Sequence, residues 1–359
     1  MKKHNFNAGP AILPKSVIKE ASKNVMNLDN SGLSILEISH RSKAFEAILE
    51  EAKSLTRELL GIGDEYEVLF LSGGASSQFY MVPLNFLGDN ETACYVDSGV
   101  WANKAIKEAK NYGTVNVLGS SKESNYTYIP KDFKTPKEAK YLHITSNNTL
   151  FGTEYFKFPK TDLPVVCDMS SDIFSRPLSM DKFDLIYAGA QKNLGPAGVT
   201  LVIVKKSFME RAVSGRMIPT MLNYVTHAKE GSMYNTPPVF PIYTCMLTMR
   251  WIKSKGGLKG MERRAKRRAE LLYNEIDTNP CFKGTAVKED RSRMNVCFLA
   301  ETPEIEAHLL QLCKDNGVEG IKGHRSVGGF RASMYNAMEI DSVQTLVNLM
   351  QETAKKFAK

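Results

Sequence analysis

Residues 184–198 have the sequence DLIYAGAQKNLGPAG. The apolar run at 185–187 is typical of a strand inside a sheet, and the small residues and loop formers after it end that strand. Lys192 lies in this loop, away from any run of charges. A lysine at an enclosed strand exit loses solvation, which lowers its pKa and makes a neutral amine available to attack an aldehyde. The alternative is an ordinary surface lysine.

Similar strand-like runs recur along the chain on both sides of this stretch. Helix-like segments alternate with them, among them an amphipathic one at 42–60 and another at 101–110. This alternation is typical of a largely parallel sheet between helices. We therefore predict an α/β fold with a mostly parallel seven-stranded sheet. Its strands are expected at residues 68–71, 92–96, 114–118, 141–144, 165–167, 185–187 and 200–204.

The chain changes in texture after about residue 255. A charged helix at 262–276, a strand at 295–299, and helices at 304–314 and from 342 onward indicate a smaller α+β unit. At 359 residues the chain exceeds what one hydrophobic core usually serves. We expect a large domain of residues 16–257 and a small domain formed by residues 1–15 and 258–359.

Composition is close to the globular average, with 43% hydrophobic and 24% charged residues, and neither a long apolar run nor a signal-peptide pattern occurs. We expect a soluble, cytoplasmic protein without membrane association. The six cysteines are widely spaced and form no Cys-x-x-Cys pair. Reduced, buried thiols explain them better than disulfides or zinc, and we expect no metal.

The net charge of +8 raises the possibility of a polyanionic partner, and its densest basic cluster is residues 263–268. The cluster is interpreted as the solvated face of a helix, with a phosphate-binding surface as the alternative. No aromatic residues interleave with its cations, as a platform for single-stranded nucleic acid would require. We therefore expect small anionic substrates rather than nucleic acid.

Two other strand exits carry informative residues. Residues 71–78 run from a strand through Gly73 and Gly74 into a helix, which suits either a phosphate cradle or a plain turn. Asp168 ends the apolar run at 165–167 and is either a ligand or a helix cap. Lys192 follows Asp168 by 192 − 168 = 24 residues, about one strand-to-strand step. A phosphate cradle, a carboxylate and an amine on strand exits are what pyridoxal phosphate needs, whereas no dinucleotide or Walker motif occurs.

Five motifs resemble those of the phosphoserine aminotransferase family, and they occur in family order. They are residues 187–198 (YAGAQKNLGPAG), 7–11 (NAGPA), 39–42 (SHRS), 235–238 (NTPP) and 323–333 (GHRSVGGFRAS). The resemblance implies the fold-type I architecture of class-V aminotransferases and a homodimer with active sites at the subunit boundary. It also implies amino transfer between L-glutamate and 3-phosphohydroxypyruvate in serine biosynthesis. A vitamin B6 pathway substrate, 4-phosphonooxy-threonine, is a further possible substrate.

The resemblance also implies roles for individual residues. Lys192 would form the Schiff base, Asp168 would pair with the pyridinium nitrogen, and Trp101 would stack on the ring. The other expected cofactor contacts are Thr149, Ala75, Ser76 and Gln191, with Asn235 and Thr236 reaching over from the other subunit. Some relatives carry a glycine–arginine pair where this chain has Ala75 and Ser76, which leaves the side-chain role of Ser76 open.

Five cationic residues fall where the family binds its doubly anionic substrate. They are His40, Arg41, His324, Arg325 and Arg331. Arginine forks suit both carboxylate and phosphate groups, although any single arginine is as well explained by a surface ion pair. The rival interpretations are a cysteine desulfurase, which needs a cysteine on a mobile loop, and an alanine–glyoxylate-type transferase, whose small acceptor does not need five cations.

Overall fold

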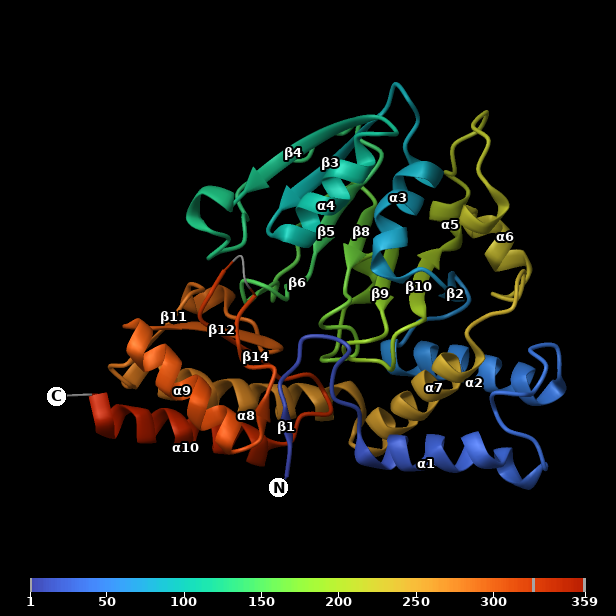
Figure 1. The fold of residues 1–359 in the computed structure, drawn as a ribbon. Helices are drawn as coiled ribbons and strands as arrows, with labels where there is room; N and C mark the ends of the chain where they lie inside the picture. Colours follow the sequence, from blue (N-terminus) through green and yellow to red (C-terminus); the bar gives the residue numbers. More distant parts are fainter. Residues whose placement is uncertain (1, 325–326, 358–359) are drawn as a thin grey trace.

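The computed structural model describes residues 2–324 and 327–357. A seven-stranded sheet lies at its centre, and all seven strands predicted from the sequence are present (Figure 1). Their bounds are Tyr66–Leu71 (β2), Thr92–Asp97 (β3), Thr114–Ser120 (β4), Leu142–Thr145 (β5), Val165–Asp168 (β8), Leu185–Gly189 (β9) and Thr200–Lys205 (β10).

The strand order is β2-β10-β9-β8-β5-β3-β4. β10 runs antiparallel to both of its neighbours, and the other neighbouring pairs are parallel. Six strands therefore point the same way, which confirms the prediction of a mostly parallel sheet. Their carboxyl ends lie at one edge, where open α/β sheets bind ligands.

Helices cover both faces of the sheet and bury alternate side chains of its strands. Cys167 packs into the core formed with α1 (Lys15–Met26), α2 (Lys43–Leu60) and α7 (Val239–Ser254). Val166 points to the opposite face, because successive side chains of a strand alternate. That face is covered by α3 (Gly74–Phe86), α4 (Val100–Ala109), α6 (Tyr224–Lys229) and the short α5 (Lys206–Met209).

The amphipathic helix expected at residues 42–60 is α2, and its ends have clear physical causes. The Ser42 side chain accepts a hydrogen bond from the Phe45 backbone N–H and caps the first turn. Gly61 ends the helix with φ 66°, a left-handed conformation that glycine adopts without strain. By contrast, α7 is apolar on almost every side and was not singled out from the sequence, because it lacks the polar face that reveals an amphipathic helix.

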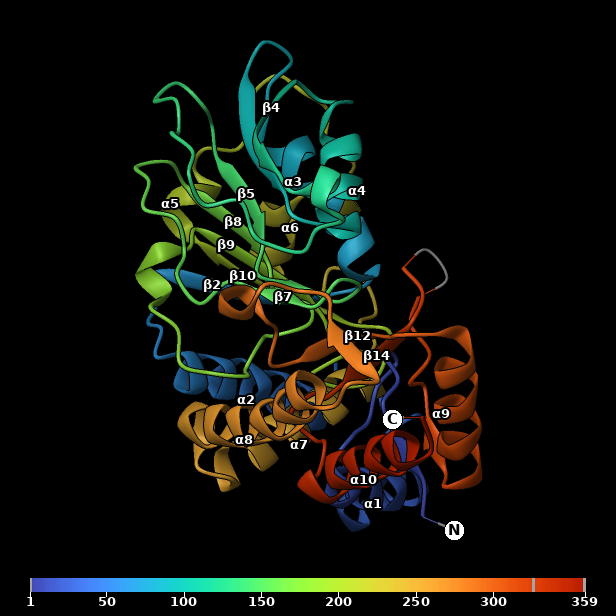
Figure 2. The same cartoon turned by 90° about the vertical axis from the view of Figure 1, so that its left-hand side faces the viewer.

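A second hydrophobic core is built mainly from the last hundred residues. The orange and red helices and strands that carry it lie together in Figures 1 and 2. Its sheet comprises β11 (Phe282–Gly284), β12 (Asn295–Ala300) and β14 (Phe330–Ser333). The helices α8 (Gly257–Thr278), α9 (Pro303–Asp315) and α10 (Ile340–Phe357) confirm the predicted helices, although α8 is longer than expected. β1 (His4–Asn5) pairs with β13 (Val318–Glu319), and a β6 (Asn147–Asn148) and β7 (Thr153–Glu154) hairpin follows β5.

The basic cluster at 263–268 is not the fully solvated helix face expected from the sequence. Arg268 is 1% exposed, and its guanidinium donates hydrogen bonds to the backbone carbonyls of Met334 and Met338. Arg264 pairs with Glu339. The sequence interpretation is wrong at Arg268 because charge alternation along a helix does not show which carbonyls face it from a distant loop.

Two other sequence-level expectations concern thiols and membranes. All six cysteines are buried and unpaired, as predicted. No helix within residues 2–324 and 327–357 combines the length and apolar character needed to cross a membrane.

Candidate active site

The carboxyl ends of the parallel strands bring together residues that are far apart in the sequence. Asp168 is the last residue of β8 and is paired in register with Tyr187 of β9. β9 ends at Gly189, and Gln191 and Lys192 lie in the loop that follows it. The Nζ atom of Lys192 donates a hydrogen bond of 2.7 Å to Thr149 Oγ1. The same Nζ atom lies 5.7 Å from the ring centre of Trp101 at the start of α4. Four predicted cofactor residues thus occupy one site.

Lys192 has an unusually low affinity for its proton. Burial lowers its pKa from the ordinary 10.5 to about 8, and the positive charge of Arg331 acts in the same direction. The negative charge of Asp168 acts in the opposite direction and raises this pKa. The lysine at this strand exit is therefore partly neutral near physiological pH, as the sequence context predicted.

Asp168 is buried, and one of its oxygens is held in place. Oδ1 accepts hydrogen bonds from the backbone N–H (2.9 Å) and the hydroxyl (2.6 Å) of Ser170. Burial raises the pKa of Asp168, whereas Lys192 and Ser170 lower it. Ser170 was missed at the sequence level, although an acid followed two residues later by a serine is a common local hydrogen-bonding pattern.

The loop between β2 and α3 has the geometry of an anion site. Gly73 and Gly74 have φ values of 101° and 71°, and a side chain at Gly73 would collide with Ser77 Oγ. Ala75 is partly buried and Ser76 is exposed in the first turn of α3. The backbone N–H groups of a first helical turn have no partner within the helix and carry partial positive charge. They can hold a phosphate group here.

The N-terminal motif at residues 7–11 lies against the lysine loop. The Ala11 backbone N–H donates to the Gln191 carbonyl at 2.9 Å. A Cβ atom added to Gly9 would come within 3.4 Å of the Lys192 side chain. Glycine at this position therefore lets the chain pass close to Lys192.

Arg331 reaches the same region from β14. Its Nε atom is buried and has no hydrogen-bond partner among the described residues. A buried N–H group without an acceptor is costly, and a substrate carboxylate would satisfy it. Its effect on the pKa of Lys192 places it within electrostatic reach of the amine.

Four other predicted residues, His40, Arg41, Asn235 and Thr236, do not join this cluster within the described chain. Arg41, Asn235 and Thr236 are exposed, and His40 is partly buried. The hydrogen bonds at these positions are local, such as that from Asn235 Nδ2 to the Thr236 carbonyl. No hydrogen bond or ion pair among the described residues connects them to Lys192 or Asp168. His324 is exposed, and Arg325 lies outside the described residues.

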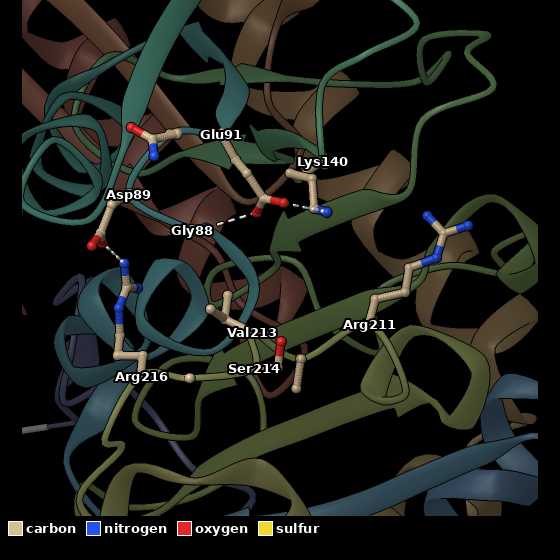
Figure 3. A pocket seen from close by; sticks show the side chains of 11 residues that line it. Gly88, Asp89, Glu91, Lys140, Arg211, Val213, Ser214 and Arg216 are labelled. Atoms are coloured by element: carbon tan, nitrogen blue, oxygen red, sulfur yellow. Dashed lines mark hydrogen bonds and ion pairs between the residues drawn. The ribbon is translucent and has the colours of Figure 1, made fainter.

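A cavity of about 660 Å³ lies away from this cluster (Figure 3). It lies at the amino ends of β3 and β5, on the edge of the sheet opposite Lys192. Lys140 pairs with Glu91, and Arg216 pairs with Asp89. Its charges largely neutralise one another, so we assign the chemistry to the Lys192 site.

The site fits a phosphate-bearing aldehyde cofactor. It offers a partly neutral amine, a buried carboxylate and a helix N-terminus at the carboxyl ends of the parallel strands β9, β8 and β2. It also offers an indole ring whose buried Nε1 has no partner among the described residues. Together with the fold, this defines a transaminase that works with pyridoxal phosphate. The chain belongs to the class-V aminotransferase family, whose model matches residues 3–346.

Within that family the chain is similar to phosphoserine aminotransferases. The enzyme of that name from Flavobacterium johnsoniae is 58% identical, with 99% of this chain and 100% of the relative covered. The solved phosphoserine aminotransferase of Bacillus circulans subsp. alkalophilus is 43% identical, with 99% of each chain covered and a TM-score of 0.96. The PLP-bound enzyme of that name from Trichomonas vaginalis is 37% identical, with 98% of this chain and 100% of that chain covered and a TM-score of 0.93.

Proposed function

We infer that this chain transfers an amino group between L-glutamate and 3-phosphohydroxypyruvate, giving O-phospho-L-serine and 2-oxoglutarate. The observation that carries the inference is the cluster of Lys192, Thr149, Asp168 and Arg331 in a chain that matches phosphoserine aminotransferases from end to end. This reaction is a step of serine biosynthesis. The proposal extends to 4-phosphonooxy-threonine as a second substrate and to a cytoplasmic location, which six unpaired thiols suit.

We propose roles for the residues around the cofactor. Lys192 would hold its aldehyde carbon, Asp168 its ring nitrogen, and the first turn of α3 at Ala75 and Ser76 its phosphate. Trp101, Thr149 and Gln191 would contact the ring and its substituents. When bound, the cofactor supplies a carbonyl that takes up the amino group and a ring that accepts electrons from Cα.

The chain's own groups would then handle binding and proton transfer. Lys192 Nζ, with a pKa lowered to about 8, is suited to take the proton from the amino donor's Cα and would deliver it to the C4′ carbon of the cofactor. The buried carboxylate of Asp168 stabilises positive charge next to it. Arg331 would bind the α-carboxylate that all the substrates share, because its Nε atom is buried and unpaired within the described residues.

The phosphate of the acceptor would be bound by His40, Arg41, His324 and Arg325. We propose that the protein is a homodimer in which His40, Arg41, Asn235 and Thr236 serve the partner's site, since no contact in the described chain brings them to their own. We also propose that residues 16–257 form the large domain and residues 1–15 with 258–359 the small one. The presence of Phe6 in the second hydrophobic core supports this division.

A comparison of acceptors tests the reaction. The purified protein with L-glutamate should form 2-oxoglutarate much faster with 3-phosphohydroxypyruvate than with pyruvate or glyoxylate. Equal rates with the unphosphorylated acids would refute the assigned substrate.

For the shared site, mixing inactive Lys192→Ala and Arg41→Ala proteins should restore partial activity, because a hybrid dimer has one intact site. No recovery after proven subunit exchange would place Arg41 in its own subunit's site.

A further inference from the structure

Asn193, the residue after Lys192, connects three separate segments of the chain through one buried side chain. Its Oδ1 atom accepts a hydrogen bond of 2.9 Å from the Asn336 backbone N–H. Its Nδ2 atom donates to the Ser171 carbonyl at 3.1 Å and contacts Met294 Sδ at 3.6 Å. The residue is only 4% exposed, so water does not replace these partners.

Each of these segments leads directly to a group of the proposed active site. Ser171 follows Asp168 by three residues. Met294 directly precedes β12, whose Cys297 is paired in register with Arg331. Asn336 lies just beyond β14, the strand that carries Arg331. A shift of Asn193 would therefore change the position of Lys192 relative to both charged groups.

The segment at 334–338 is itself firmly anchored. Arg268 binds two of its backbone carbonyls. The Met334 backbone N–H donates to the Met294 carbonyl at 2.7 Å. Asn336 Nδ2 donates to the Phe174 carbonyl at 2.9 Å. The backbone N–H group of Asn336, which donates to Asn193, is thus fixed from three directions. It can therefore hold the lysine loop in a defined position.

We propose that Asn193 is a positioning residue, which holds Lys192 in place between the Asp168 loop and the Arg331 strand. The proposal rests on the proposed function, since it assigns the amine, the carboxylate and the guanidinium to one reaction. A purely structural role is the alternative, in which Asn193 stabilises the fold and nothing more.

Asn279 is a matched control for that alternative. It is also buried, at 7% exposure, and uses its amide in the same pattern. Its Nδ2 atom donates to Glu275 Oε1 (2.7 Å) and the Met350 carbonyl (3.1 Å), and its Oδ1 atom accepts from the Cys281 N–H (3.0 Å). These contacts all lie within the second core and involve no residue of the proposed site.

The test compares Asn193→Ala with Asn279→Ala in the cofactor-loaded protein. Both variants should lower the thermal unfolding temperature to a similar extent. Only Asn193→Ala should shift the pH midpoint of the bound cofactor's visible absorption, by roughly one pH unit. It should also lower kcat by roughly 10- to 100-fold with a smaller change in KM, because misplacement of a reacting group acts on the chemical step.

The proposal would be overturned if Asn193→Ala loses stability but keeps the absorption midpoint and the kcat of the wild-type protein. If Asn193→Ala does not fold, Asn336→Ala gives the decision, since it keeps the N–H that Asn193 accepts but removes the anchor to Phe174. It should also shift the midpoint, and an unchanged midpoint would refute the role. The absorption titration needs no phosphorylated acceptor, so it tests the positioning role whatever the substrate is. An error in the assigned substrate would instead appear as low activity of the wild-type protein with 3-phosphohydroxypyruvate.

Discussion

Replacing Asp168 with Asn should make Lys192 easier to deprotonate. The carboxylate of Asp168 raises the pKa of Lys192, whereas burial and Arg331 bring it down to about 8. Relative to a lysine at 10.5, that value increases the neutral fraction at pH 7 about 300-fold. Loss of an opposite charge typically shifts a pKa by about 1–3 units. The midpoint of Lys192 in Asp168→Asn should therefore fall by at least about one unit.

Competitive acetylation of the cofactor-free protein measures this midpoint. Acetic anhydride reacts with the neutral amine, and mass spectrometry of the peptide that carries Lys192 reports its extent as the pH is varied. Asp184→Asn is the control, because Asp184 pairs with Lys205 at the other edge of the sheet. A midpoint that stays unchanged or rises in Asp168→Asn, or a wild-type midpoint near 10.5, would refute the electrostatic reasoning.

Three further perturbations probe other parts of the structure. In the cofactor-free protein, the pKa of Lys192 is about 8 in the folded state, below its ordinary 10.5. The charged lysine therefore destabilises the fold fully below pH 8 and no longer does so above pH 10.5. Urea unfolding should show the wild type gaining stability relative to Lys192→Met between these pH values, and a constant difference would contradict the assignment. Arg268→Met should cost roughly 2–4 kcal/mol of unfolding free energy, because two buried carbonyls lose their donor; a loss below about 0.5 kcal/mol would show that they find other partners. Arg331→Leu should lower kcat/KM for every substrate, L-glutamate included; an effect confined to the phosphorylated acceptor would assign Arg331 to phosphate binding.

The sequence predicted features that depend on neighbouring residues, and it failed where distant segments meet. Most strands of the central sheet could be predicted because they are apolar runs bounded by turn formers, whereas the edge strand β4 is more polar and largely exposed. The closeness of Asp168 and Lys192 followed from their spacing by one strand-to-strand step, which the pairing of β8 with β9 confirms. The reversed direction of β10 and the burial of Arg268 were not predictable, since neither leaves a pattern in the local sequence.

The role of Asn193 illustrates the same limit. Its contacts with Ser171 and Asn336 span 22 and 143 residues, and only the folded chain brings these partners together. Nothing in the type or spacing of a single asparagine indicates such contacts. The roles of His40 and Arg41 depend on the proposed second subunit, and Arg325 lies outside the described residues. The roles of these three residues and of His324 in phosphate binding stay predictions.

The segment of residues 4–11 finds its partners in distant parts of the chain. β1 pairs with β13, the Ala8 carbonyl accepts a hydrogen bond from Tyr335, and the Ala11 N–H binds the Gln191 carbonyl. Residues 4–8 can therefore form these contacts only after residues 318–335 have been synthesised. A protein stalled before residue 335 would lack the partner of Ala8, whatever the state of its central sheet. For the same reason, a protease cut that removes the first eleven residues should disturb the lysine loop, although it leaves all seven central strands intact.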